Sequence, residues 1–366
     1  LRFFSLFFGV LTAPLVYRVG RRLFPRTPQI ALLAALLAAT SPYLVWYSQE
    51  GKMYSLVTCL ILLSMERYLA ALERGGWQRW AGYVAASSAA FYVHLLAALI
   101  VPVQVLVFVV AGRRDGYRRW KPWLASLAAL TLPYLPLLVW QLPMLLEKSV
   151  TGYRFVPLDD MLLSLLSSYS LGVLEGPSLW LLLPFVAILL AAGTLLVRRR
   201  EWRASLWLLV CWLLLPVLAL FLVTLVRPMY TARYLIYLLP AYLLLLALAV
   251  VALAGRSRIV AGALLASILA VNGWGLWLQA RTPLKADFRS ATAFVCQRLE
   301  ANDLLIFQIP HGRYLFDYYY ELPGGPGREG GEGAGFVVFL PLLVRSGGPG
   351  YRWGEGLYTN AGMTPA

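Results

Sequence analysis

Long apolar runs separated by short polar segments make up most of the sequence. A run of roughly 17 to 25 apolar residues lets a helix cross the hydrocarbon core of a bilayer. The pattern therefore predicts about ten membrane spans. These spans cover residues 3–20, 29–47, 53–71, 80–95, 96–111, 122–142, 177–197, 204–226, 234–254 and 259–279.

One of these divisions rests on a weak interruption of the pattern. Between residues 80 and 111 only His94 and Pro102 break the apolar stretch. We interpret the stretch as two spans, because a single span would put the basic segments after it on the opposite side from those before it.

Basic clusters lie between alternate predicted spans. Because Lys and Arg concentrate in cytoplasmic loops, we assign all of these clusters to the cytoplasmic side. This orientation puts the first residue, the turn at 41–54 and residues 280–366 outside the membrane. The clusters are Arg18, Arg21, Arg22 and Arg26; Arg67, Arg74 and Arg79; Arg113, Arg114, Arg118, Arg119 and Lys121; Arg198, Arg199, Arg200 and Arg203; and Arg256 and Arg258.

The predicted fold is an all-α polytopic membrane protein with a small C-terminal domain. Residues 1–280 form the multi-span domain, and residues 281–366 form an extracytoplasmic domain of α/β type. Within this second domain, we expect the glycine-rich residues 322–366 to be flexible.

Composition and charge agree with a membrane protein and exclude other classes. The chain is 60% hydrophobic and 13% charged, and its mean hydropathy is +0.69. A net charge of +15 would suit nucleic acid, but here the cations punctuate apolar runs, so we expect no nucleic-acid partner. The three cysteines indicate no disulfide, and the sequence has no metal-ligand spacing, no phosphate-binding glycine loop and no nucleophile elbow.

Polar residues near the outer ends of the spans are the candidate site. An ionisable group at membrane depth is costly and usually faces a partner or an aqueous cavity. Cations can bind a phosphate, aromatic rings can stack on a sugar, and a carboxylate can deprotonate a hydroxyl, so together they suit a lipid-linked phosphosugar. The candidates are Glu50, Lys52, Tyr54, His94, Arg227, Arg233 and Tyr234, with Glu147, Lys148, Tyr153, Arg154, Asp159 and Asp160 in an outer loop.

Each candidate also has a plain structural interpretation. The aromatic residues can form an interfacial belt, and the two arginines can extend to lipid headgroups. Glu50 and Lys52 can be a solvated loop pair, and His94 can be a hydrogen-bonded core residue. Asp159 and Asp160 can stabilise the start of the helix that follows them.

Several segments resemble the bacterial family 39 glycosyltransferases. These are relatives of the protein O-mannosyltransferases and of the aminoarabinose transferase that modifies lipid A. The resemblance covers roughly residues 1–320 and is carried by residues 1–24, by Arg233-Tyr234 with Leu239-Pro240, and by Ser48-Gln49-Glu50-Gly51-Lys52-Met53-Tyr54. The last segment is similar to the family's S-Q-E-A-R-M-Y-like turn, with Gly for Ala and Lys for Arg. Asp287-Phe288-Arg289, followed by a strand at 304–307, resembles the start of the family's external domain.

This resemblance implies a GT-C helical bundle and an inverting transfer of a hexosyl or pentosyl group. The donor would be a polyprenyl-phosphate sugar, and the acceptor a hydroxyl of a protein, lipid or glycan at the outer face of the plasma (inner) membrane. Glu50 would be the second acidic group of the active cavity, and Lys52 and Arg233 would bind the donor phosphate. Tyr54 and Tyr234 would support these cations, Arg227 would join them at the substrate, and His94 matches a recurrent histidine of unassigned role. No cofactor is indicated, and a divalent metal ion stays open.

The sequence departs from the family at its beginning. Family members carry one more span and a long first external loop that supplies the aspartate taken as the catalytic base. We therefore expect the chain to be either an N-terminally incomplete transferase or a scaffold without its base. The rival functions are a transporter or flippase for lipid-linked sugars and a non-catalytic membrane scaffold.

Overall fold

The computed structural model describes most of the chain and divides it into two compact units. We call residues 1–146 with 151–282 the membrane unit, and residues 147–150 with 283–366 the C-terminal unit. The described residues are 2–115, 117–132, 134–136, 139, 153–173, 179–198, 201–282, 286–298, 305, 307 and 310–321. The loop candidates Glu147 and Lys148 and the glycine-rich segment 322–366 lie outside them.

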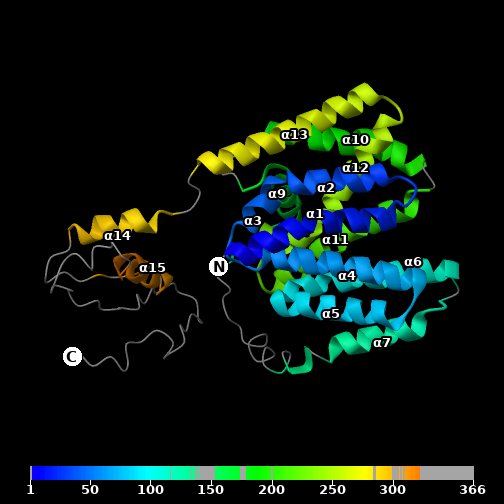
Figure 1. Cartoon of the computed structure of the whole chain (residues 1–366), viewed down its shortest axis with the longest axis horizontal. Coiled ribbons are helices and arrows are strands. Elements are labelled where there is room, and N and C mark those ends of the chain that lie inside the picture. Colours follow the sequence, from blue (N-terminus) through cyan, green and yellow to red (C-terminus); the bar gives the residue numbers. More distant parts are fainter. Residues whose placement is uncertain are drawn as a thin grey trace. The chain divides into compact units, whose positions relative to one another are not determined.

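The membrane unit is a bundle of helices joined by short turns. Figure 1 shows most of its longer helices lying side by side along one direction. In chain order its described helices are α1 (Arg2–Leu23), α2 (Pro28–Ala39), α3 (Pro42–Ser48), α4 (Tyr54–Arg74), α5 (Trp77–Val93), η1 (Leu95–Ile100), α6 (Val101–Asp115), α7 (Trp120–Thr131), α9 (Leu158–Leu171), η2 (Leu179–Leu182), α10 (Leu183–Arg198), α11 (Arg203–Val226), η3 (Ala232–Leu238), α12 (Leu239–Ala254) and α13 (Arg258–Arg281).

Helix α12 is the centre of the bundle. It packs against α2, α10, α11 and α13. In the η3–α12 segment, 89% of the most apolar 18-residue stretch is buried inside the bundle. The buried share of the equivalent stretch is 22% in α13 and 28% in α1. A helix that is apolar on every side and enclosed by other helices is a core element of a membrane protein, and this one positions the bundle around it.

The outer helices expose large apolar side chains that a water-soluble protein would bury. Phe3 is 71% exposed, Leu222 63%, Val226 89% and Ile259 85%. In a helix of membrane-spanning length, exposed apolar side chains of this kind indicate contact with lipid. The structure therefore confirms the predicted class, a helical membrane protein.

The number of crossings stays a prediction. Among the described residues, five helices are long and apolar enough to cross a membrane, and the bent pair α2–α3 makes up to six. The segments Leu95–Val110 and Trp180–Leu190 are apolar but shorter. The predicted span 122–142 begins in α7, and its second half lies largely outside the described residues.

The predicted span 29–47 consists of two helices that meet at an angle of 56°. The break falls at Ser41, whose side-chain oxygen accepts a hydrogen bond from the backbone N–H of Leu44 and caps α3. Pro42 occupies the first position of α3, where a missing N–H is tolerated. The polar cap and the proline end one helix and begin the next within an apolar run.

His94 separates α5 from the helices that follow. Its backbone is extended (φ −154°, ψ 110°), and it both ends α5 and precedes η1. The single apolar stretch from 80 to 111 is therefore broken at His94, with α5 before the break and η1 and α6 after it; its division into two spans stays a prediction.

The described part of the C-terminal unit contains two helices, α14 (Phe288–Cys296) and α15 (Pro310–Glu321). Asp287 caps α14, accepting a 3.0 Å hydrogen bond from the backbone N–H of Ser290. This capping bond holds the pKa of the Asp287 carboxyl below its ordinary value. The predicted strand at 304–307 falls mostly outside the described residues, so the α/β class of this domain stays a prediction.

Candidate functional site

The turn between α3 and α4 carries the sequence motif and is held in place from both sides. The Ser5 hydroxyl of α1 donates a 3.0 Å hydrogen bond to the backbone carbonyl of Lys52. The Ser55 hydroxyl of α4 donates a 2.9 Å bond to the carbonyl of Tyr47. Gly9 lets α1 approach so closely that an added Cβ would overlap the Cβ of Ser48. Backbone contacts thus fix the turn independently of its charged side chains.

Five rings from separate parts of the membrane unit meet beside this turn, and we call them the ring cluster: Tyr47, Tyr54, His94, Tyr153 and Tyr234. The Tyr47 and Tyr54 ring centroids lie 4.9 Å apart, and the Tyr54 and His94 centroids 6.3 Å apart. The His94 and Tyr234 ring centroids lie 5.2 Å apart. The hydroxyl oxygens of Tyr234 and Tyr153 lie 2.6 Å apart. These contacts join α3, α4, the α5–η1 break, the chain before α9, and η3.

Two charged side chains of opposite sign lie next to the ring cluster. The Arg233 guanidinium carbon is 5.8 Å from the Tyr234 ring centroid, and Arg233 also lies near Tyr153. Arg233 and Glu50 both lie near Tyr47 and Tyr54. A carboxylate, a guanidinium and several stacking faces are therefore within reach of one another.

At the site, Nδ1 of His94 and Nε of Arg233 are buried and have no hydrogen-bond partner within the described part of the chain. A buried polar atom left unpaired is costly, and such atoms at a functional site often pair with a ligand or water. Donors and acceptors of this kind are what a polar substrate would use.

The surrounding helices hold the site rigidly. Pro42 of α3 packs against Gly172, which ends α9, and against Gly275 of α13, where an added Cβ would lie within 3.0 Å of it. The Tyr237 hydroxyl donates a 2.7 Å hydrogen bond to the Leu96 carbonyl, which ties η3 to η1. Small residues allow this close approach of helices, and the hydrogen bond sets the distance between the segments that carry Arg233 and His94.

The sequence-predicted residues take different places in this arrangement. Glu50, Tyr54, His94, Arg233 and Tyr234 lie in or beside the ring cluster. Lys52 is exposed on the turn, and half-buried Arg227 ends α11, six positions before Arg233.

Two tyrosines of the ring cluster, Tyr47 and Tyr153, were given no role from the sequence, although Tyr153 was among the outer-loop residues named there. Tyr47 directly precedes the motif that contains Glu50, but an aromatic residue at the end of an apolar run does not stand out there. Tyr153 lies in a polar loop far along the chain, and only the fold places it against Tyr234. The sequence signal that could have pointed to Tyr153 was its position beside Arg154 in an outer loop.

Metal ligands do not gather in the described residues. No group of three or more His, Cys, Asp or Glu side chains there could hold a metal ion. Cys59, Cys211 and Cys296 are free thiols.

These observations define a multi-pass membrane protein with a polar, aromatic-lined site where several helices end. Comparison with known families gives it a more specific relation. The family model described as dolichyl-phosphate-mannose-protein mannosyltransferase matches residues 1–140. This match includes Glu50, Tyr54 and His94, confirms the family resemblance over that region, and supports a membrane glycosyltransferase of the GT-C type. No curated protein and no solved structure matches the chain.

Proposed function

We propose that the protein transfers a sugar from a polyprenyl-phosphate donor to an acceptor hydroxyl at the outer face of the membrane. The observation that carries this proposal is that Glu50 and Arg233 both lie near Tyr47 and Tyr54 of the ring cluster. Residues from both ends of the membrane unit's sequence form this arrangement, and its three kinds of group match the three parts of the reaction.

Each group has a distinct task in the proposed reaction. The acceptor oxygen attacks the anomeric carbon of the sugar from one face, and polyprenyl phosphate leaves from the other, which inverts that carbon. The Glu50 carboxylate faces the acceptor and takes or orients the proton of its hydroxyl. Arg233 binds the departing phosphate, whose negative charge grows as the bond to the sugar breaks. The tyrosine rings bind the apolar face of the sugar.

A second set of residues completes the donor site in this proposal. Lys52 and Arg227 bind the donor phosphate, with Lys52 contributing a point charge rather than a bidentate fork. Tyr54, His94 and Tyr234 form its wall. The expected outer face is periplasmic or extracellular, and the C-terminal unit lies on that side.

The first test is the substitution Glu50→Gln in the full-length protein, assayed with polyprenyl-phosphate sugars. We expect transfer to fall by about a hundredfold or more, because loss of a proton acceptor usually costs that much, while donor binding is retained. The matched control is Asp160→Asn, which neutralises an exposed carboxylate in the first turn of α9.

The complementary substitution is Arg233→Ala, which we expect to weaken donor binding as well as transfer. A lipid-linked sugar transporter would keep moving its substrate in Glu50→Gln, and a scaffold would be indifferent to both changes. Either result would contradict the proposed transfer reaction.

A further inference from the structure

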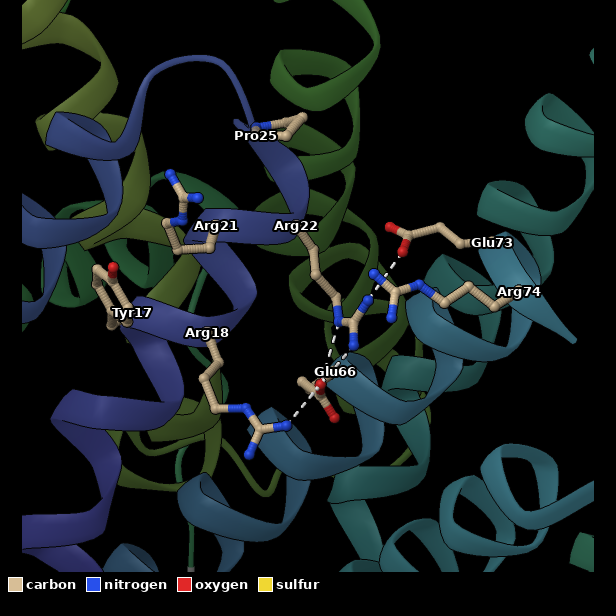
Figure 2. A pocket seen from close by; sticks show the side chains of 8 residues that line it. All are labelled: Tyr17, Arg18, Arg21, Arg22, Pro25, Glu66, Glu73 and Arg74. Carbon is tan, nitrogen blue, oxygen red and sulfur yellow. Dashed lines mark hydrogen bonds and ion pairs between the residues drawn. The ribbon is translucent and has the colours of Figure 1, made fainter. Parts of the chain in front are cut away.

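A second charged site lies elsewhere in the membrane unit, in a cleft of about 520 Å³. Its walls come from the C-terminal half of α1, the turn after it and the last turns of α4. The cleft belongs to the face that the basic clusters assign to the cytoplasm. Figure 2 shows its lining residues: Tyr17, Arg18, Arg21, Arg22, Pro25, Glu66, Glu73 and Arg74.

A buried carboxylate organises this cleft. Glu66 is 1% exposed, and its Oε1 accepts hydrogen bonds from Arg22 at 2.8 and 3.1 Å and from Arg18 at 3.1 Å. Figure 2 shows both arginines reaching Glu66, with Arg22 also bonded to Glu73. Burying a charge requires paired and hydrogen-bonded partners, so these bonds fix where the two guanidinium groups lie.

The ion pairs in the cleft do not neutralise all of its positive charge. Four arginines and two glutamates line the cleft, and both glutamates are bonded to Arg22. Within the described part of the chain, Arg21 and Arg74 have no ion pair, and Arg18 bonds to Glu66 through a single nitrogen. The remaining guanidinium donors are the chemistry that recognises a phosphate group.

An apolar surface leads along α1 to the same cleft. Phe3, Phe7, Val10 and Tyr17 recur at spacings of three, four and seven residues on one side of the helix, and Arg21 continues that side. The four apolar side chains are 71%, 49%, 66% and 38% exposed. A ligand with a phosphate at one end and acyl chains at the other would match both the cleft and this face.

We infer that the cleft binds the phosphate headgroup of an anionic phospholipid, with its acyl chains along the exposed face of α1. Charge complementarity favours an anionic over a zwitterionic lipid. Basic pockets between transmembrane helices on the cytoplasmic side select such headgroups. The volume is also in the range of small-molecule sites.

The test is binding of phosphatidylglycerol to the full-length protein in neutral detergent, measured by native mass spectrometry. Phosphatidylcholine and inorganic phosphate are the comparison ligands. The variant Arg21→Ala/Arg74→Ala removes both unpaired arginines and leaves the Glu66 bonds intact. The matched control, Arg256→Ala/Arg258→Ala, removes two exposed arginines outside the cleft on the same predicted face.

We expect wild-type and control proteins to retain phosphatidylglycerol over phosphatidylcholine, and the cleft variant to bind phosphatidylglycerol at least about tenfold more weakly. Equal retention of the two lipids, or an equal affinity of the cleft variant and the control, would overturn the inference. Inorganic phosphate that displaces phosphatidylglycerol at similar concentrations would show an anion site without lipid selectivity, and would overturn it too.

Discussion

Individual aromatic side chains decide between two interpretations of the outer turn. In an interfacial belt, Tyr and Trp lie where the protein surface meets the headgroups. Tyr47 and Tyr54 are instead only 6% and 3% exposed, and both contact rings of the cluster. Their burial in the bundle favours a structural or binding role over a belt.

The hydrogen bond between the Tyr153 and Tyr234 hydroxyls gives a prediction that a change of one oxygen atom can test. Tyr234→Phe removes the 2.6 Å hydrogen bond and leaves the ring that stacks near His94. Because such a bond contributes about 1 kcal/mol, we expect a several-fold loss of donor affinity with little change in thermal stability. Tyr318→Phe, which removes an exposed hydroxyl in the C-terminal unit, is the control. Unchanged donor affinity in Tyr234→Phe would count against the pair as part of the site.

Gly9 gives a second residue-level prediction, on packing. Gly9→Ala places a methyl group against Ser48, and we expect it to destabilise the protein by about 1–3 kcal/mol. The double variant Gly9→Ala/Ser48→Gly removes the overlapping atom and should recover much of the loss in thermal unfolding. The control is Gly262→Ala in α13, where an added Cβ meets nothing within 4 Å. A neutral Gly9→Ala would show that α1 and α3 do not need this close approach.

At the scale of elements, local sequence signals such as capping residues set where a helix begins or ends. Asp287 caps α14, and the bond from Ser290 lowers the pKa of its carboxyl. A carboxyl with a lowered folded-state pKa stabilises above its unfolded pKa, and this contribution is lost as pH falls through the folded value. The protection of the first amides of α14 against hydrogen exchange, relative to their intrinsic rates, should therefore fall below the ordinary Asp pKa of 3.8.

The Asp287→Asn variant separates this effect from general acid unfolding. Asparagine also caps helices but does not titrate in this range, so the protection of these amides, relative to their intrinsic exchange rates, should stay level across it. The same acid dependence in both proteins would show that another group controls the end of α14.

The sequence predicts the apolar elements better than the breaks between them. Hydrophobic runs locate α1, α4, α11 and α13 to within a few residues, because the bilayer imposes one length and one polarity on every span. The run at 29–47 hides the bend at Ser41, because serine and proline interrupt the apolar pattern too briefly to mark a helix end.

The candidate site was only partly predictable for a related reason. Glu50 and Arg233 were chosen because charge at membrane depth is unusual, and that signal is local to each residue. The meeting of Tyr153 with Tyr234 depends on how distant segments pack, and no local pattern carries that information.

For the whole molecule, the orientation in the membrane is the next property to test. A variant with Cys59, Cys211 and Cys296 replaced by alanine would carry one new cysteine at Arg256 or at Asp160. In intact cells, we expect a membrane-impermeant maleimide to label Asp160→Cys but not Arg256→Cys, because the basic clusters put position 256 inside. Permeabilised cells provide the control, since both positions are exposed there. Labelling of Arg256→Cys in intact cells would reverse the predicted topology.

The central place of α12 has a consequence for how the protein is made. α2 packs against α12, yet residues 40–238 are synthesised between them. The side of α2 that carries Ala31, Ala34 and Ala38 is buried in the finished bundle. α1 already packs against α2, but until α12 emerges from the ribosome α2 lacks this second neighbour. We expect nascent chains that stop before α12 to stay bound to insertion factors and to be open to membrane proteases.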